Sequence, residues 1–597
     1  MSTSFRLAVA DEWAAHDPFG RVKPADARKH PPKAPDEDGT VVLRAACGGY
    51  ASFRVLVRGR GRFRLSVSLD GGLEADLYRA WYHPLDQGGG QSKVYLPDAL
   101  IPARKNQVFE IPDPDNRIPG QSVQEFWVDV FVPPDARPGE VTGRVRLSAG
   151  GDSSDLAVRV DVLEAVVPET PCVVIDHNSY GCRWLADYYP RALRGNRASE
   201  HYWHKSAELL QHYHRVVHEH RGTFHNLGYG HSGQFDPIYG PRAVGRGREK
   251  RLQDWDYFDR HYGPLLLGSA FRTASPGLPT PRRPATPVWG VYAPINPEWP
   301  ASYLWWGEPG YEVEFTRCVG QFDEHFRVNG WTRSYVEFFF NHKKRYRWFE
   351  WDGDEVKYAK DDAYHLEMIR LWKKAIGDSP VPWVYRADVS WRMKWQFERL
   401  GGSRNLWDCG GFCAWYPEEI RRVLARGEIV TWYGGYPRID AATSGVLQNL
   451  YRTWGRGLNG FGAWQTVIPG RDPWFACDGA ATGAIYPGER FGIEGPIPSI
   501  RLKVLRNGIQ DIDLLDLAAR QAGRLEQARA QLLEAVGVPV WQKPPRVARE
   551  LPPEDWDSIN LQAEHEPIMV PEERLGPGWW AIVRDLAFSA ARRREPR

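Results

Sequence analysis

Cysteine and methionine are scarce in this chain, and long apolar runs are missing. Seven cysteines and four methionines occur among 597 residues. Because the number of cysteines is odd and none stands in a paired CxxC arrangement, we expect neither a zinc knuckle nor a disulfide framework. No stretch of 18 consecutive apolar residues is present, so we expect no membrane-spanning helix.

The first twenty residues, MSTSFRLAVADEWAAHDPFG, lack the apolar core of a signal peptide. The sequence as it stands therefore predicts a cytoplasmic protein. A chain whose signal had been removed would begin in the same way, so a secreted or periplasmic location stays open as the alternative.

An excess of charge of one sign is also missing. The formal net charge is +2 with 25% charged residues, which argues against a nucleic-acid partner. Neither GxxxxGK[ST] nor a strand-linked GxGxxG is present, and we expect no phosphate-binding loop and no cofactor. His214 and His218 have the i, i+4 spacing of zinc ligands, but HExxH is absent and we expect no metal site.

Aromatic residues, by contrast, are abundant. The chain holds 27 Trp, 26 Tyr and 24 Phe, together 13% of its residues, which is more than a core of this size usually needs. Burial is the commoner role of any one Trp. A surplus of Trp and Tyr beside polar residues nevertheless suits a site that stacks on the apolar faces of sugar rings.

The chain is too long for a single core, and its pattern changes near residue 165. Residues 1–165 contain short alternating strands separated by turns, which predicts an N-terminal antiparallel β-sandwich domain. The segment VPETP at 167–171 is the predicted linker. Residues 521–597 are expected to form a helical and irregular C-terminal appendage.

Residues 170–520 alternate strands with amphipathic segments, which predicts a (β/α)8, or TIM, barrel as the catalytic domain. Its third and eighth units are long, so the barrel is expected to be distorted. The eight strand candidates are 172–176, 223–228, 288–292, 335–340, 382–386, 404–408, 428–432 and 460–464. The fold class is therefore multidomain, β followed by α/β.

Polar and aromatic residues gather where these strands end, and a barrel builds its active site at the carboxyl ends of its strands. Carboxylates, amides and indoles at this mouth suit a neutral, hydroxyl-rich ligand. The predicted substrate-binding residues are Asp176, Asn341, Arg386, Asp388, Trp432, Tyr433 and Trp464.

The run YVEFFF at 335–340 reads as a buried strand, and a long polar loop follows it. This loop carries Asp354 and Glu355 before Asp361 opens a helical pattern. Adjacent carboxylates in such a loop can serve as a general acid and a charge stabiliser. A solvated turn is the plain alternative.

Several motifs resemble glycoside hydrolase family 123 and its relatives with a DUF4091-type C-terminal region. They are FFFN-K, WDxDE, RADVS, VTWYGG, GFGAWQT, IYPG and PIPSIRLKVLRNGIQD within 311–516, and WVDVFVPPDARPGEVTGRV at 127–145. The resemblance implies a β-sandwich before a barrel. It also implies that Asp354 and Glu355 are the catalytic pair, although the family usually has proline where this chain has Val356.

The same resemblance implies retaining hydrolysis of β-linked N-acetylhexosamine, most often N-acetylgalactosamine, in an oligosaccharide or glycoconjugate. The acetamido group of the substrate is then the nucleophile. Glu355 would act as acid and base, and Asp354 would hold the acetamido N–H.

Other interpretations stay open. The chain could be a non-catalytic carbohydrate-binding barrel, because Val356 departs from the proline that the family usually has. It could also hydrolyse a sugar without an acetamido group, in which case Asp388 or Asp408 would be the nucleophile. Cys409 and Cys413 follow the sixth strand candidate, where a structural role is favoured over a reactive thiol.

Overall fold

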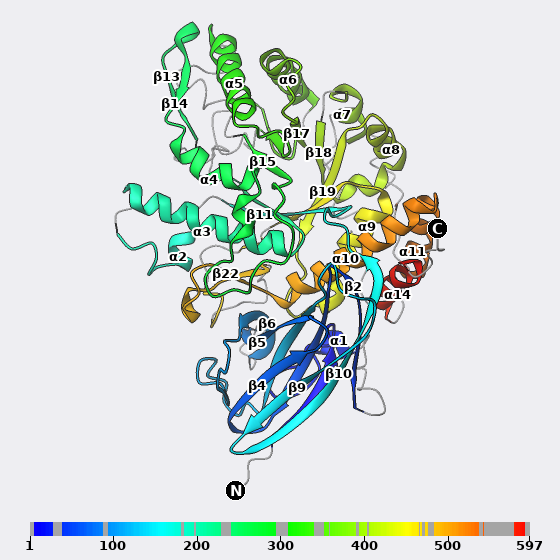
Figure 1. Ribbon diagram of the computed structural model, residues 1–597. Coiled ribbons are helices and arrows are strands. Elements are labelled where there is room, and N and C mark those ends of the chain that lie inside the picture. The colour runs from blue at the N-terminus through cyan, green and yellow to red at the C-terminus, as the bar shows by residue number, and fades with distance from the viewer. Residues whose placement is uncertain are drawn as a thin grey trace.

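The computed structural model describes most of the chain, and all structural statements refer to the residues it describes. These are residues 5–27, 39–86, 93–180, 184–195, 199–227, 240–293, 309–339, 351–356, 359–389, 393–402, 405–464, 466–467, 472–475, 483–536, 541 and 578–591. Figure 1 shows strands in blue and cyan at one end and a strand-and-helix body in green and yellow at the other, with the orange helix α10 between them.

Two five-stranded sheets make up the N-terminal part, and their facing sides enclose one apolar core. In the first sheet the order is β1-β3-β8-β5-β6, and every neighbouring pair is antiparallel. Its strands are β1 (Arg6–Asp11), β3 (Tyr50–Arg58), β8 (Val123–Phe131), β5 (Glu74–Leu85) and β6 (Val94–Pro102). The second sheet, in the order β2-β10-β9-β4-β7, consists of β2 (Val41–Cys47), β10 (Asp152–Val166), β9 (Gly139–Ala149), β4 (Gly61–Leu69) and β7 (Phe109–Ile111).

One strand pair departs from the predicted antiparallel sandwich, because β2 and β10 run parallel. About a hundred residues separate them in sequence, so no tight turn forces them to be antiparallel. The short helix α1 (Pro24–Ala27) lies between β1 and β2 in the chain.

The second part is an eight-stranded parallel sheet curled into a nearly closed barrel. The order is β12-β11-β20-β19-β18-β17-β16-β15, which is the circular order of consecutive βα units. The strands are β11 (Val174–Tyr180), β12 (Thr223–Leu227), β15 (Gly290–Tyr292), β16 (Tyr335–Phe338), β17 (Trp383–Val389), β18 (Asn405–Cys409), β19 (Ile429–Gly435) and β20 (Gly460–Trp464).

The eight strand candidates of the sequence all occur in this one sheet, so the prediction of a β-sandwich followed by a barrel is confirmed at that level. Within the described residues no backbone ladder joins β12 to β15, and the barrel has an open seam there. The segment between β12 and β15 includes the hairpin β13 (Arg242–Val244) and β14 (Arg251–Gln253), which lengthens the second βα unit, whereas the sequence predicted that the third and eighth units are long.

Helices follow the strands around the barrel. Ser199 and Ser499 begin two of them as the N-cap residue, each accepting a backbone N–H three residues later. The helices are α2 (Leu185–Tyr188), α3 (Glu200–Glu219), α4 (Asp256–Leu266), α5 (Tyr311–Val328), α6 (Asp362–Ile376), α7 (Met393–Arg399), α8 (Pro417–Ala425), α9 (Val446–Arg456) and α10 (Ile500–Gln521). The small pair β21 (Ile485–Pro487) and β22 (Pro496–Pro498) precedes α10.

Helix α10 joins the two parts through buried charges. Asp129 of β8 accepts hydrogen bonds from Lys503 and, over 2.8 Å, from Arg506 of α10. Burial by itself raises the pKa of Asp129, but the two cations outweigh it and hold that pKa well below its ordinary value. The sandwich is therefore fixed against the barrel by ion pairs as well as by apolar contact.

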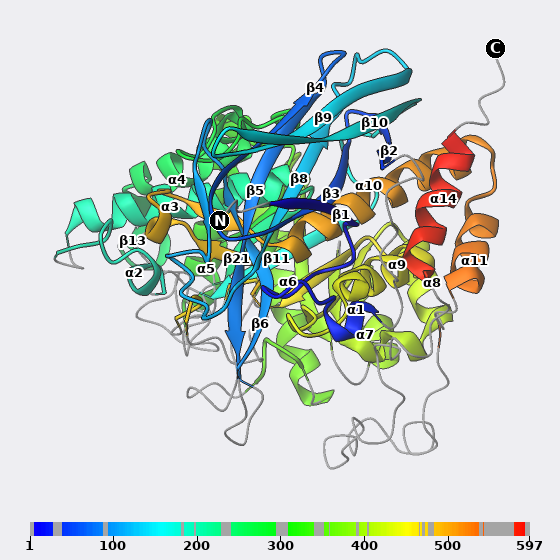
Figure 2. The same ribbon diagram turned by 90° about the horizontal axis from the view of Figure 1, so that it is seen from below.

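Two more helices, α11 (Leu525–Val536) and α14 (Trp579–Ala591), pack beside α10 and lie next to each other (Figure 2). Arg584 of α14 donates to Asp511 of α10 over 3.0 Å and to Glu12. Among the described helices, none is long and apolar enough to cross a membrane.

Candidate active site

The loop after β16 carries the two carboxylates, and its described residues are 351–356. The N-terminal residues of this segment, Trp351 and Asp352, are held against α6. The indole of Trp351 is buried and stacks on Tyr364, with ring centroids 5.4 Å apart and planes nearly parallel. The Asp352 backbone N–H donates to a carboxylate oxygen of Asp361 over 3.2 Å, and His365 Nε2 lies 3.3 Å from the Asp352 carbonyl oxygen.

The second end of this loop is bound to β17. The backbone N–H of Val356 donates to the carbonyl oxygen of Asp388 over 3.1 Å, and Val356 pairs with Val389 as a parallel bridge. Val356 is itself buried. Val356 therefore makes a backbone hydrogen bond that proline, which has no backbone N–H, could not make at this position.

Asp354 and Glu355 lie between these two anchors. Asp354 is 6% exposed, whereas Glu355 is half-buried. Glu355 has a φ of 49°, in the left-handed region that side chains other than glycine rarely adopt. The cost is on the order of 1–2 kcal/mol, and such strain is typical of functional sites.

Tyr433 connects the loop to the opposite side of the barrel. Its hydroxyl group on β19 donates to Glu355 Oε1 over 3.2 Å. The sequence predicted that Tyr433 binds the substrate. The structure instead places the phenol against the proposed acid/base carboxylate, where it can orient that group.

Arg386 of β17 is the centre of the charged network inside the mouth. Its Nε donates to Asp388 over 2.7 Å and its Nη2 donates to Asp408 over 2.6 Å. Nη1 faces Tyr292 and Glu337. Because the guanidinium is buried and all three of its nitrogens have protein partners, Arg386 holds the carboxylates in place.

The carboxylates of this network do not behave like exposed ones. The pKa of Asp388 lies well above 3.8, mainly because its carboxyl group is buried. The charge of Arg386 lowers this pKa, whereas the charges of Asp408 and Asp354 raise it further. Burial likewise raises the pKa of Asp408 and of Glu337. Asp388 therefore holds a proton more readily than an exposed aspartate does.

His225 of β12 closes the barrel seam with its side chain. Nδ1 donates to Asp176 over 2.7 Å, and Nε2 donates to the Gly290 carbonyl oxygen of β15 over 2.8 Å. Burial alone lowers the pKa of His225, but the charges of Asp176 and Glu337 outweigh it and raise that pKa to about 9. A protonated imidazole thus joins the two strands that share no ladder.

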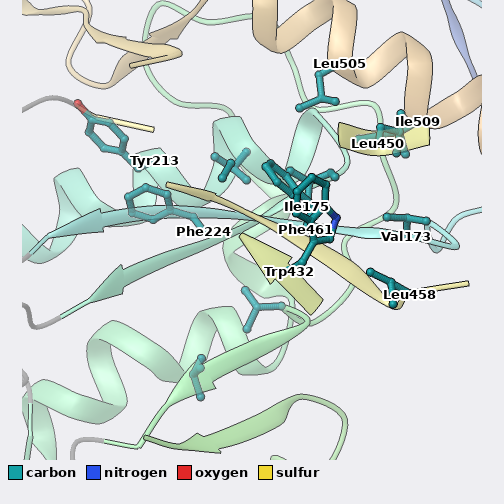
Figure 3. Close-up of a cluster of buried hydrophobic side chains, with 14 of the residues drawn as sticks. Val173, Ile175, Tyr213, Phe224, Trp432, Leu450, Leu458, Phe461, Leu505 and Ile509 are labelled. Atoms are coloured by element: carbon teal, nitrogen blue, oxygen red, sulfur yellow. The ribbon is translucent and has the colours of Figure 1, made fainter. Parts of the chain in front are cut away.

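The expectation that Trp432 lines the mouth is wrong. Its indole is 1% exposed, donates to Thr453 of α9 over 2.7 Å and lies 5.0 Å from the ring of Phe461. Figure 3 shows it inside the apolar cluster between the sheet and its helices. Side chains alternate along a strand, so Trp432 points outward because Thr431 and Tyr433 point inward.

Two predicted residues cannot be placed. Asn341 and the side chain of Trp464 lie outside the described residues, although the backbone of Trp464 pairs with Gly435 in β20. Asp176, Arg386 and Asp388 do come together around the Arg386 guanidinium, and Tyr433 contacts Glu355.

Sequence reasoning missed Glu337 and His225. Glu337 is the single charged residue within the apolar run YVEFFF. Because charged residues are rarely buried without a partner, this position could have been predicted to face a functional site. His225 carries no signal in the sequence, because its pairing with Asp176 depends on the side-by-side placement of β12 and β11. Among the described residues no group of three His, Cys, Asp or Glu side chains is arranged to hold a metal ion.

Cys409 and Cys413 are both fully buried and free. Burial raises the pKa of each thiol, which keeps it protonated and unreactive.

Comparison with solved structures identifies a shared fold. A family 123 glycoside hydrolase from Clostridium perfringens, solved in a study of glycolipid glycan hydrolysis, aligns over 99% of this chain and 97% of its own, with a TM-score of 0.61 and 14% identity. A putative α-galactosidase from Bacteroides fragilis NCTC 9343 aligns over 79% of this chain and 77% of its own, with a TM-score of 0.25 and 10% identity. No family model and no curated protein matches the sequence.

Proposed function

We propose that this protein is a retaining glycoside hydrolase that cleaves β-linked N-acetylhexosamine, with N-acetylgalactosamine as the preferred sugar, from an oligosaccharide or glycoconjugate. The observation that carries the proposal is the Asp354–Glu355 pair, held on a loop that is bonded to the carboxyl end of a barrel strand. The likeness in fold to a family 123 glycoside hydrolase supports it.

In this proposal Glu355 protonates the glycosidic oxygen while the acetamido oxygen of the substrate attacks the anomeric carbon. The aglycone leaves as an alcohol, and the sugar becomes an oxazolinium ion. Asp354 accepts the acetamido N–H and stabilises the developing positive charge. Water then attacks the anomeric carbon, Glu355 takes its proton, and the acetamido group re-forms with net retention.

The neighbouring carboxylates favour assistance by the substrate over a protein nucleophile. Asp388 and Asp408 are both bound to Arg386, and burial raises the pKa of each. A nucleophilic carboxylate has to be ionised and free to approach the anomeric carbon. Both carboxylates are better suited to holding the Arg386 network.

Aryl β-glycosides that differ only at carbon 2 and carbon 4 test the proposal. We expect turnover of the aryl β-N-acetylgalactosaminide, slower turnover of the glucosamine epimer because its inverted O4 leaves polar groups unpaired, and none of the 2-hydroxy analogue. A thiazoline analogue of N-acetylgalactosamine should inhibit, because it mimics the cyclised intermediate.

Efficient cleavage of the 2-hydroxy sugar without thiazoline inhibition would assign Asp388 or Asp408 as nucleophile instead. Binding of N-acetylgalactosamine without turnover of any aryl glycoside would make the chain a carbohydrate-binding protein.

A further inference from the structure

A second pocket lies where the β-sandwich meets the barrel, and its volume is about 460 Å³. Arg79 of β5 and Arg104, in the turn after β6, line it from the sandwich. Arg191, between α2 and α3, and Arg490, between β21 and β22, line it from the barrel. Figure 1 shows β22 beside the β5–β6 end of the sandwich. We call this space the junction pocket. None of its described lining residues belongs to the Arg386 network or to the carboxylate loop.

A 3₁₀ turn, Glu489–Phe491, brings the arginines of the junction pocket together. The Glu489 carboxylate accepts the backbone N–H of Arg191 over 3.0 Å and is not among the described lining residues. Arg104 Nη2 of the sandwich donates to the Phe491 carbonyl oxygen over 3.4 Å. Arg490 is the residue between these two contacts. One short turn thus holds a barrel loop and a sandwich turn on the same pocket.

Three of the four arginines have no carboxylate partner. Arg104, Arg191 and Arg490 are exposed, and within the described part of the chain no carboxylate oxygen lies within 4 Å of their guanidinium groups. The fourth, Arg79, is buried and donates over 3.3 Å to Asp115, the single carboxylate among the described lining residues. The junction pocket therefore presents positive charge whose N–H donors are open to solvent.

Aromatic rings hold the Arg490 guanidinium in place. Its carbon Cζ lies 4.7 Å from the ring centroid of Phe475 and 5.5 Å from that of Trp81. Trp81 is fully buried and packs edge-on against Trp474, with centroids 5.4 Å apart, so the rings under Arg490 belong to a core. A guanidinium that stacks on a ring keeps its N–H groups in its own plane, where they can pair with an oxyanion.

The remaining lining suits a sugar ring. The half-buried ring of Phe491 offers an apolar face of the kind that packs on sugars. Gln107 Oε1 accepts the backbone N–H of Arg104 over 2.9 Å, and among the described residues its Nε2 has no partner, which leaves an amide donor for a hydroxyl group. The volume falls within the range of roughly 300–1,000 Å³ that is usual for small-molecule sites.

We propose that the junction pocket binds a sugar that carries a carboxylate or a sulfate ester. The oxyanion pairs with the guanidinium groups of Arg104, Arg191 and Arg490, since a guanidinium can bind such a group through two parallel N–H donors. The ring packs on Phe491, and Gln107 donates to a hydroxyl group. The pocket then serves as an accessory site for an acidic glycan substrate, and this role alone rests on the proposed function.

Calorimetric titration of the full chain tests the proposal with four ligands at equal ionic strength: galacturonate, galactose 6-sulfate, neutral galactose and inorganic sulfate. We expect both acidic sugars to bind at least tenfold more tightly than galactose, which lacks the anion, and than inorganic sulfate, which lacks the ring. Arg104→Gln and Arg490→Gln should each raise the Kd of the acidic sugars roughly tenfold, because each removes a charge-assisted hydrogen bond.

Arg272→Gln is the matched control, because Arg272 is likewise exposed, belongs to the 3₁₀ turn Ser269–Arg272 and does not line the junction pocket. The Tm of each variant reports its folding, and Arg104→Gln carries the test if Arg490→Gln lowers Tm through its lost ring contacts.

The proposal is overturned if neither acidic sugar binds more tightly than galactose, or if inorganic sulfate binds as tightly as they do. It is also overturned if Arg104→Gln and Arg490→Gln leave Kd unchanged, or if Arg272→Gln weakens binding as much as they do. Binding is measured without turnover, so a failure of this site and a failure of the proposed glycosidase activity are separate results.

Discussion

The backbone N–H of Val356 lies 3.1 Å from the carbonyl oxygen of Asp388, and this hydrogen bond joins the carboxylate loop to β17. Asp388 also pairs with Arg386 through its side chain. One residue of β17 thus holds the loop with its main chain and the charged network with its carboxylate. The position of Glu355, directly before Val356, therefore depends on β17.

Replacing Val356 by proline tests this anchor. We expect Val356→Pro to lower kcat on an aryl β-N-acetylgalactosaminide and to cost about 1 kcal/mol of unfolding free energy, because one buried hydrogen bond is lost. Val356→Ala keeps the N–H and controls for the lost side chain. Steady-state kinetics and urea unfolding give the two quantities, and a proline variant with the activity of the alanine variant would show that the bond is dispensable.

Glu355→Gln and Asp354→Asn should fail in different ways. Glu355→Gln removes proton donation, so substrates with poor leaving groups should slow most and an activated aryl glycoside least. Asp354→Asn removes the charge that stabilises the oxazolinium ion, so every substrate should slow by roughly 10²–10³-fold.

A series of aryl glycosides with graded leaving groups measures this difference as the slope of log kcat/KM against leaving-group pKa. Equal slopes for the two variants would contradict the separate roles of Asp354 and Glu355.

Tyr433→Phe should impair catalysis more than stability. The hydroxyl donates to Glu355, and a donor favours the ionised carboxylate, so its loss should move the alkaline limb of the kcat/KM profile to higher pH. We expect a rate loss of roughly tenfold.

The neighbouring Trp432→Phe is the matched control. Trp432 packs against α9, so this variant should lower Tm and leave the pH profile in place. A profile that moves equally in both variants would show that Tyr433 acts only through packing.

His225 should make stability depend on pH. Its pKa of about 9 in the folded protein exceeds the ordinary value of 6.5. Protonated His225 therefore contributes fully to the free energy of unfolding below pH 6.5, and this contribution is lost as pH rises through 9. The difference between the two values corresponds to roughly 3 kcal/mol.

Urea unfolding of the wild type and of His225→Gln at pH 6, 7.5 and 9 measures this contribution. The free-energy gap between them should shrink as pH rises, because the variant lacks the imidazolium that joins β12 to β15. A gap that stays constant would mean that folding does not raise the pKa of His225.

The order of elements and the position of the carboxylate pair along the chain are predictable from local sequence patterns. Eight apolar strand segments alternate with amphipathic helices, and this local periodicity predicts strands in sequence order because it depends on near neighbours only. The buried run ending at Phe338 and the polar loop that carries Asp354 and Glu355 were predictable for the same reason.

The directions of the side chains and the pairing of charges, in contrast, follow from the three-dimensional packing of the barrel. Trp432 and Tyr433 are adjacent and equally aromatic in sequence, yet strand register sends one into the helix layer and the other to Glu355. The pairing of His225 with Asp176 and the bond from Val356 to Asp388 join different strands and loops. Such contacts depend on how the barrel curls. The pattern of residues along the chain does not show which distant residues this curling brings together.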